Sequence, residues 1–192
     1  MKQFSPIYEK LKISLDEARY EHTLGVMYTA GCMAMAFGYD VNKAMLAGLL
    51  HDCAKCMSHN ERLILCEKYD VVVTTSELEN KALLHAKAGA ILAKIEYDIC
   101  DEEILHAIEV HTTGEPNMSM LDKIIYIADY IEPGRDKAPN LELVRRIAYK
   151  DLDACMAQIL SDSLSYLKTC NQIIDETTVK AYEFYKQYRK EL

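Results

Sequence analysis

The residues that decide the fold are 46–52, LAGLLHD, in which a leucine-rich helical run ends in a histidine and an aspartate. Leu46, Leu49 and Leu50 recur at the spacing of one helix face. Asp52 follows Leu49 by three positions, so it continues that apolar face. A lone aspartate at this place is also compatible with a helix-ending turn, and the choice depends on the rest of the chain.

Helical patterns continue on both sides of this segment. Ser5-Pro6 predicts the start of a first short helix, with Ser5 as its cap. Ser14-x-x-Glu17 is a capping-box pattern, which predicts the start of a second helix that ends at Gly38. A second capping box, Ser58-x-x-Glu61, predicts another helix to about residue 69.

The predicted fold class is all-α, a bundle of about nine or ten helices with a C-terminal helical lobe. Seven Gly and four Pro leave no linker or low-complexity tract, so we expect one domain over residues 1–192. Val71–Thr75 is β-branched but has no partner strand, so we expect an extended connector there. The remaining helices are predicted after Asp40 and over Asn80–Ile95, Asp101–Thr112, Met118–Ile131, Leu141–Tyr149, Asp151–Lys168 and Thr177–Lys190.

The composition argues against several classes of function. Lys and Arg number 22 against 30 Asp and Glu, a net charge of −8, which does not suit a protein that binds nucleic acid through its phosphates. No apolar run approaches the roughly 20 residues of a membrane span, and the N-terminus MKQFSPIYEKLK has no apolar signal core. Seven scattered cysteines in such a chain predict reduced thiols and a cytoplasmic location.

Titratable residues interrupt the apolar faces of five predicted helices. They are His22, His51-Asp52, His85, His111 and Asp129. Each histidine alone is compatible with a core residue satisfied by one hydrogen bond. An unpaired buried carboxylate costs several kcal/mol, so Asp129 in its apolar helix needs a cation or a full set of hydrogen-bond donors. One shared metal site explains all of these residues, and imidazole with carboxylate favours Fe, Mn, Zn or Co.

Other candidate residues have simpler interpretations. His59, in a capped first turn, and His106, off the face of His111, are expected at the surface or in ordinary packing. Cys53-x-x-Cys56 lacks the further ligands of a structural zinc site and the βαβ setting of a redox pair. We therefore expect both cysteines to be incidental.

The histidines and aspartates match a known pattern. His22, His51-Asp52 and Asp129, in this order on successive helices, resemble the HD superfamily of metal-dependent phosphohydrolases. The chain more closely resembles the YqeK family through His51-Asp52-Cys53-Ala54-Lys55, His85, His111-Thr112-Thr113-Gly114 and Ala128-Asp129-Tyr130-Ile131-Glu132-Pro133-Gly134-Arg135. The resemblance covers nearly the whole chain, with an HD core at about residues 17–134 and C-terminal helices at about 140–190. The chain departs from the pattern at residues 174–177, IDET, where His-Pro-x-Thr is expected.

The resemblance implies a symmetrical bis(5′-nucleosyl)-tetraphosphatase, which splits diadenosine tetraphosphate into two molecules of ADP with iron in its active site. Manganese, cobalt and zinc stay open as alternatives, as do one ion or two. The implied ligands of one metal are His22, His51, Asp52 and Asp129, and those of a second include His85 and His111. Thr112 and Arg135 match positions that contact the nucleotide.

The chemistry of the residues suggests their roles. Asp52 is the natural bridge between two cations, and Lys55 lies one turn beyond His51, within reach of a phosphate chain. Arg135 offers the planar fork that suits phosphate oxygens. Asp52 and Lys55 are therefore the predicted catalytic residues. The predicted substrate-binding residues are His22, Asp52, Lys55, His85, His111, Thr112, Asp129 and Arg135.

Two alternatives to this function remain open. The first is an HD phosphohydrolase that acts on other nucleotides or on cyclic dinucleotides. The second is a non-catalytic nucleotide or metal sensor that uses the same pocket. A small nucleotide is the expected partner, without nucleic acid or membrane, and the oligomeric state stays open, a homodimer included.

Overall fold

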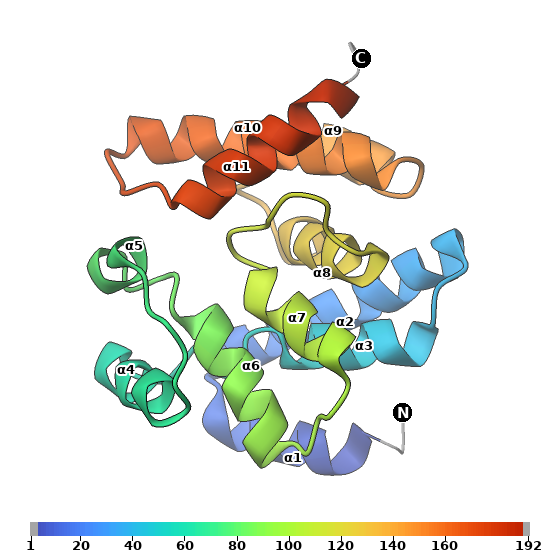
Figure 1. Ribbon diagram of the computed structural model, residues 1–192. Helices are drawn as coiled ribbons and strands as arrows, with labels where there is room; N and C mark the ends of the chain where they lie inside the picture. Colours follow the sequence, from blue (N-terminus) through green and yellow to red (C-terminus); the bar gives the residue numbers. More distant parts are fainter. Residues whose placement is uncertain (1–3, 190–192) are drawn as a thin grey trace.

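Eleven α-helices and a short 3-10 helix form residues 4–189, the part of the chain described by the computed structural model (Figure 1). These residues contain no strand, which confirms the predicted all-α class. The elements are α1 (Ser5–Ser14), α2 (Glu17–Phe37), α3 (Val41–Leu50), α4 (His59–Lys68), α5 (Thr75–Glu79), α6 (His85–Glu96), α7 (Glu102–Val110), α8 (Met120–Ile131), α9 (Leu141–Ile147), α10 (Leu152–Thr169), α11 (Glu176–Tyr185) and η2 (Lys186–Tyr188). None of the described helices is both long and apolar enough to cross a membrane.

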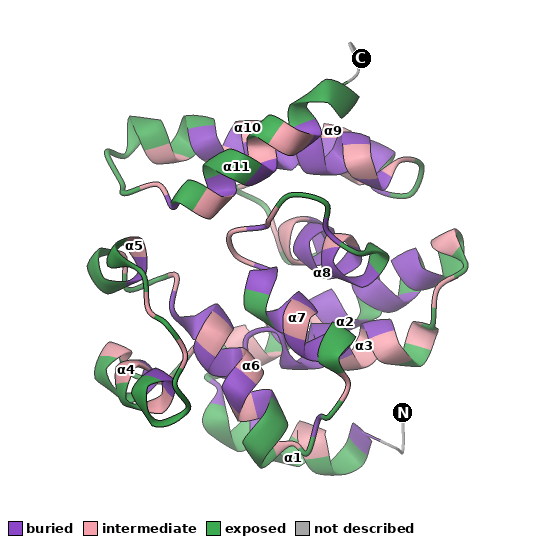
Figure 2. Ribbon diagram, in the orientation of Figure 1, coloured by how far each residue is buried: buried purple, intermediate pink, exposed green. Residues whose placement is uncertain are grey.

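Helices α2, α3, α7 and α8 form the centre of the bundle. α2 packs against α3 and α8, and α7 packs against α3, α6 and α8. Leu49 of α3, Ile108 of α7 and Ile125 of α8 are fully buried between them. Figure 2 shows that buried residues are concentrated on these helices, whereas the outer sides of α4 and α5 are exposed.

Helices α9, α10 and α11 form a layer beyond α8, on the side opposite to α1 (Figure 1). Tyr185 of α11 is fully buried, and its hydroxyl accepts the N–H of Met118 at 2.8 Å, just before α8 begins. The C-terminal helices are therefore bonded to the segment that carries α8 as well as packed on it.

Helices α4 and α5 lie at the edge of the bundle. Cys66, Leu84 and Ile91 form a small separate core between α4 and α6. The expected extended connector is confirmed for residues 71–74, but α5 was not predicted. Its start is a capping box in which the side chain of Thr74 accepts the N–H of Glu77.

Several predicted helix ends are confirmed by their caps. Gly38 ends α2 in the left-handed conformation, with φ 66°. Asp40 begins α3 by accepting the N–H of Lys43 at 3.0 Å, and Ser58 opens α4 through a complete capping box. The predicted end of the last helix at residue 190 lies outside the described residues.

Two predicted helix starts and one predicted cap are wrong. α1 begins at Ser5-Pro6 as predicted, but Ser5 is its first residue and Phe4 is in the cap position. Ser14 is the last residue of α1, and the buried, extended Leu15 turns the chain so that Asp16 caps α2 instead. α6 begins at His85, five residues later than predicted, because residues 81–84 form turns.

Candidate metal centre

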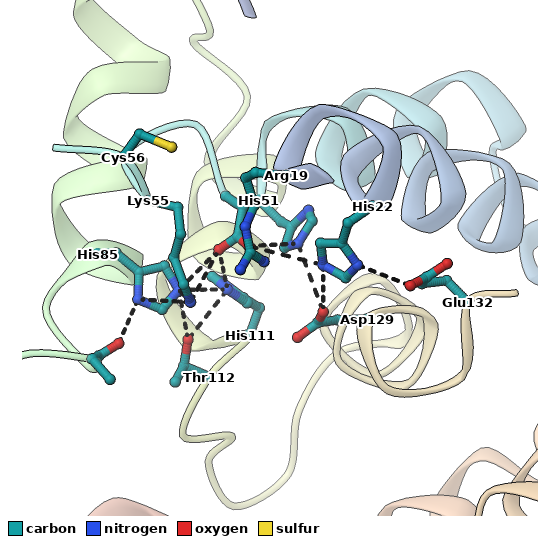
Figure 3. Close-up of polar contacts among 12 residues, drawn as sticks. Arg19, His22, His51, Lys55, Cys56, His85, His111, Thr112, Asp129 and Glu132 are labelled. Carbon is teal, nitrogen blue, oxygen red and sulfur yellow. Dashed lines mark hydrogen bonds and ion pairs between the residues drawn. The ribbon is translucent and has the colours of Figure 1, made fainter. Parts of the chain in front are cut away.

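One group of candidate ligands joins three helices. His22 comes from the second turn of α2, His51 from the residue that ends α3, and Asp129 from α8 (Figure 3). Nε2 of His22 lies 3.0 Å from Oδ1 of Asp129, and Nε2 of His51 lies 3.8 Å from the same oxygen. The three ligand atoms lie within 4.8 Å of one another, a grouping that could hold one metal ion.

Asp52 connects this group to a second one. Its Oδ2 faces the first group, 3.5 Å from Nε2 of His51 and 3.9 Å from Nε2 of His22. Its Oδ1 faces the other way, 3.0 Å from Nε2 of His85 and 3.5 Å from Nε2 of His111. Asp52 therefore presents one oxygen to each of two histidine pairs, an arrangement that suits a two-metal centre.

Backbone carbonyls orient three of the four histidines. In each case Nδ1 donates to the carbonyl three residues earlier: His51 to Gly48 (2.7 Å), His85 to Ala82 (2.6 Å) and His111 to Ile108 (2.7 Å). A carbonyl only accepts, so Nδ1 carries the proton and Nε2 keeps the lone pair that a metal ion needs.

The donor atoms of this centre fit a metal ion. Nε2 of His22, Nε2 of His51 and Oδ1 of Asp52 are buried and have no hydrogen-bond partner among the described residues. A buried polar atom left unsatisfied costs about 1–3 kcal/mol, so three within one cluster need an explanation. A divalent cation, for which imidazole and carboxylate are suitable ligands, would satisfy all three.

The electrostatics keep these groups in their ligand forms. Burial alone would raise the pKa of Asp52, but the surrounding imidazoles, His51 foremost, hold it well below its usual range. Burial lowers the pKa of His85 to about 4, in spite of the opposing charge of Asp52. Near neutral pH, Asp52 is therefore charged and His85 is neutral, as metal binding requires.

Asp129 is less isolated than its sequence context suggests. Its side chain is 24% exposed, and Arg135 donates to its Oδ1 at 2.6 Å and to its carbonyl at 2.9 Å. Burial by itself would raise the pKa of Asp129, but His22, His51 and Arg135 lower it. The expected need of Asp129 for a cation is met in part by Arg135, so a metal ion would not be the only group that compensates this charge.

Lys55 and Thr112 lie beside the second histidine pair (Figure 3). Nζ of Lys55 is 3.0 Å from Nε2 of His85 and 3.5 Å from Oδ1 of Asp52, and burial lowers the pKa of this lysine. Oγ1 of Thr112 is 3.2 Å from Nε2 of both His85 and His111. The structure thus brings all nine of the predicted site residues to one centre.

Two residues of the centre were not found from the sequence. Arg19 places Nη1 2.7 Å from Oδ2 of Asp52, and Glu132 places Oε1 3.0 Å from Nδ1 of His22. Arg19 lies one turn before His22 on the same helix, so the spacing contained a usable signal. Glu132 follows the end of α8, where helical periodicity no longer indicates which way a side chain points.

A cavity of about 700 Å³ opens beside His22 and Asp129. Three cations, Arg19, Arg135 and Lys137, line it together with Tyr130. The other lining residues are Asp16, Ala18, Glu132, Gly134, Asp136 and Ala138. The cavity therefore places three cations beside four carboxylates, and its two arginines are side chains that can bind the phosphate of a small ligand.

The remaining candidates lie apart from the centre. His106 contacts Asp122 at 3.1 Å and Glu115 at 3.2 Å, in a separate group. Cys53 is buried against the Gly89 carbonyl, and no cysteine joins the potential metal groups of the described residues. None of the seven cysteines, all within residues 4–189, is in a disulfide.

The fold and the His/Asp arrangement define an HD-domain protein. The HD-domain family model matches residues 19–134, and the chain belongs to that family, as its motifs predicted. The family implies a divalent metal ion, in agreement with the donor set of the centre.

Particular relatives cover nearly the whole chain. A protein of Halalkalibacterium halodurans named symmetrical bis(5′-nucleosyl)-tetraphosphatase is 43% identical, over 90% of this chain and 91% of its own. A protein of the same name from Bacillus subtilis is 39% identical, over 91% and 92%. A crystal structure of a Clostridium acetobutylicum protein, described as a predicted HD superfamily hydrolase involved in NAD metabolism, is 38% identical with a TM-score of 0.93, over 97% of this chain and 98% of its own.

Proposed function

We propose that this chain is a symmetrical bis(5′-nucleosyl)-tetraphosphatase that hydrolyses diadenosine tetraphosphate to two molecules of ADP. The observation that carries the proposal is the position of Asp52 between two histidine pairs, next to a cavity lined by Arg19, Arg135 and Lys137. Relatives that match about nine-tenths of the chain bear this name.

The proposed metal centre has two parts. We assign His22, His51, Asp52 and Asp129 to one ion, and His85 and His111, with Asp52 as the shared ligand, to a second. Such ions supply an activated water and a Lewis acid for the phosphoryl group. The family resemblance favours iron, and the test is the metal content of protein purified without oxygen, where iron should exceed manganese, cobalt and zinc.

The residues around the centre have distinct proposed roles. The tetraphosphate carries several negative charges. Lys55 and Arg135 would neutralise these charges and orient the phosphate chain. Arg135 would exchange its contact with Asp129 for a contact with phosphoryl oxygens. The hydroxyl of Thr112 would donate a hydrogen bond to another phosphoryl oxygen. Lys55 has a pKa lowered by burial, so it is also suited to give a proton to the bridging oxygen of the departing nucleoside diphosphate.

The proposed hydrolysis is symmetrical. The oxygen of one water forms a bond to one of the two central phosphorus atoms, and the bond from that atom to the central bridging oxygen breaks. Each half then leaves as a nucleoside diphosphate, and both protons of the water end in solvent when the two diphosphates are fully ionised. Cleavage at any other phosphoanhydride would give AMP and ATP.

The decisive experiment is product analysis with a panel of substrates. The metal-loaded protein is incubated with diadenosine tetraphosphate, other dinucleoside polyphosphates, ordinary nucleotides, cyclic dinucleotides and NAD. We expect ADP as the sole product from diadenosine tetraphosphate and much slower turnover of the rest. Faster turnover of another class would replace the proposed substrate, and stoichiometric metal with no turnover would indicate a sensor.

A further inference from the structure

The carboxylate of Glu132 is buried beside the centre without being one of its proposed ligands. Glu132 is 3% exposed, and its Oε1 lies 3.0 Å from Nδ1 of His22. We infer that Glu132 is a positioning residue, which holds His22 with Nδ1 protonated and Nε2 turned towards Asp129. This inference rests on the metal centre of the proposed function.

His22 needs such a partner because of its place in the fold. His51 and His111 end their helices, where backbone carbonyls have no helical partner and can accept from Nδ1. His22 lies inside α2, where the neighbouring carbonyls already accept backbone N–H groups. An acceptor for its Nδ1 therefore has to come from another element, and Glu132 at the end of α8 provides it (Figure 3).

Glu132 is itself held in place by two other residues, Gly134 and Arg145. Its Oε2 accepts the N–H of Gly134 at 2.5 Å. Arg145 of α9 donates to the carbonyls of Ile131, Glu132 and Arg135 at 2.9–3.0 Å, so one guanidinium binds the turn that carries the carboxylate. Because the turn is anchored, Glu132 can fix the ring of His22 rather than follow it.

Gly25 makes the room that this contact needs. Gly25 lies one turn after His22 on α2, and a Cβ there would be 2.5 Å from Oε2 of Glu132. The carboxylate cannot yield freely, because the N–H of Gly134 holds the same oxygen. A side chain at position 25 would therefore push Glu132 away from His22.

Glu132→Gln tests the inference because it changes the hydrogen-bond pattern and keeps the size. The N–H of Gly134 requires an acceptor, so the amide oxygen should stay there and the amide NH₂ should face His22. Nδ1 would then accept, and the proton would move to Nε2, where a metal ion should bind. We expect nitrogen NMR of the metal-free full chain to show this change of tautomer at His22.

The same variant should bind Mn²⁺ about 10–100-fold more weakly by calorimetric titration, the range usual for loss of a partner behind a metal-binding histidine. Glu77→Gln is the matched control, since Glu77 is also a buried, bonded glutamate but its carboxylate accepts from Lys87 and from the backbone N–H of Thr74 in its own capping box. It should leave both the tautomer and the Mn²⁺ affinity unchanged. An unchanged His22 tautomer in Glu132→Gln would overturn the inference, even if affinity fell.

A second pair of variants tests the geometry without touching His22 or Glu132, and decides the question if Glu132→Gln does not fold. Gly25→Ala should weaken Mn²⁺ binding by about tenfold. Gly31→Ala, on the same helix, would contact Met45 at 2.8 Å, whose flexible side chain can shift, and it should bind Mn²⁺ as the wild type does. Equal affinities in the two variants would contradict the role of Glu132. If the variants show these effects but the wild-type protein turns over none of the substrate panel, the proposed activity is overturned and the role of Glu132 is not.

Discussion

Asp52 joins the two halves of the centre, because its Oδ2 faces His22 and His51 while its Oδ1 faces His85 and His111. Arg19 contacts the same carboxylate at 2.7 Å, so the side chain of Asp52 links both groups of candidate ligands to the wall of the cavity. Loss of this residue should therefore damage more than one interaction at once.

We expect Asp52→Ala and His51→Ala each to lower turnover of diadenosine tetraphosphate by at least about 10³-fold and to reduce bound metal. Both residues follow the end of α3, so the helix content should stay at the wild-type level. Metal analysis, circular dichroism and turnover measure the three effects. Full metal occupancy in Asp52→Ala would remove Asp52 from the ligand set.

The two cysteines next to Asp52 should not matter for the chemistry. Cys56 is exposed, and Cys53 is buried against the Gly89 carbonyl. We expect Cys53→Ser and Cys56→Ser, singly or together, to keep turnover within a few fold of the wild type. Burial of a hydroxyl at position 53 should cost about 1–3 kcal/mol, visible in thermal unfolding. Loss of metal from the double variant would contradict this view.

Single residues were predictable from the sequence where a polar group interrupts an apolar face. His22 and Asp129 were found in this way, because helical spacing states which side of a helix they occupy. Glu132 could not be found, since it follows the last turn of α8 and its direction depends on Gly134 and Arg145. The partnership of Asp129 with Arg135 depends on a loop conformation that spacing does not describe.

At the scale of helices and turns, caps with a single candidate were predictable and caps with competing candidates were not. Ser58 is the cap expected from its sequence, whereas Ser14 was displaced by Asp16 two residues later. The capping box Thr74-x-x-Glu77 was present in the sequence, but the preceding β-branched run obscured it. Local patterns therefore located most helices, and where two caps compete, the burial of Leu15 accompanies the choice of Asp16 over Ser14.

The contact between α7 and α8 should respond to pH through His106. Burial would lower its pKa, but the hydrogen bond to Asp122 and the charges of Asp122 and Glu115 raise it. A raised pKa means that the charged histidine stabilises the fold, fully below the unfolded pKa of about 6.5 and no longer once pH has risen through the folded pKa.

We therefore expect His106→Gln to lower the melting temperature at pH 6 more than at pH 9. Both proteins are measured after metal removal, so that metal binding does not add its own pH dependence. An equal difference at the two pH values would show that the charge of His106 does not stabilise the contact.

At the scale of the whole molecule, metal removal should destabilise the fold. A metal ion at 100 times its dissociation constant adds about 2.7 kcal/mol, which for a chain of this size is roughly 5–10 °C in melting temperature. The difference should shrink as pH falls, because protons compete for the histidine ligands. Equal melting temperatures with and without chelator, after confirmed metal removal, would contradict metal binding to the folded state.

The single-domain organisation stays a prediction, which the same melting curves would test. One cooperative transition for the whole chain is expected, since α9–α11 pack on α8 and Tyr185 is bonded to the segment before it. Two separate transitions would divide the C-terminal helices from the rest.

The Asp129→Asn variant should not stabilise the metal-free protein, because it would leave Arg135 without its ionic partner.

The guanidinium of Arg145 supports the proposed centre from outside the segment that matches the HD-domain family. All the proposed ligands lie within the HD-domain match, residues 19–134, yet the turn that follows α8 is bound by a side chain eleven residues beyond that boundary. A graft of the matched segment into another scaffold would carry every ligand and leave the anchor behind. In an engineered chimera, the transferable unit is therefore the HD core with α9, and a domain boundary drawn by sequence similarity alone would divide the active centre from its support.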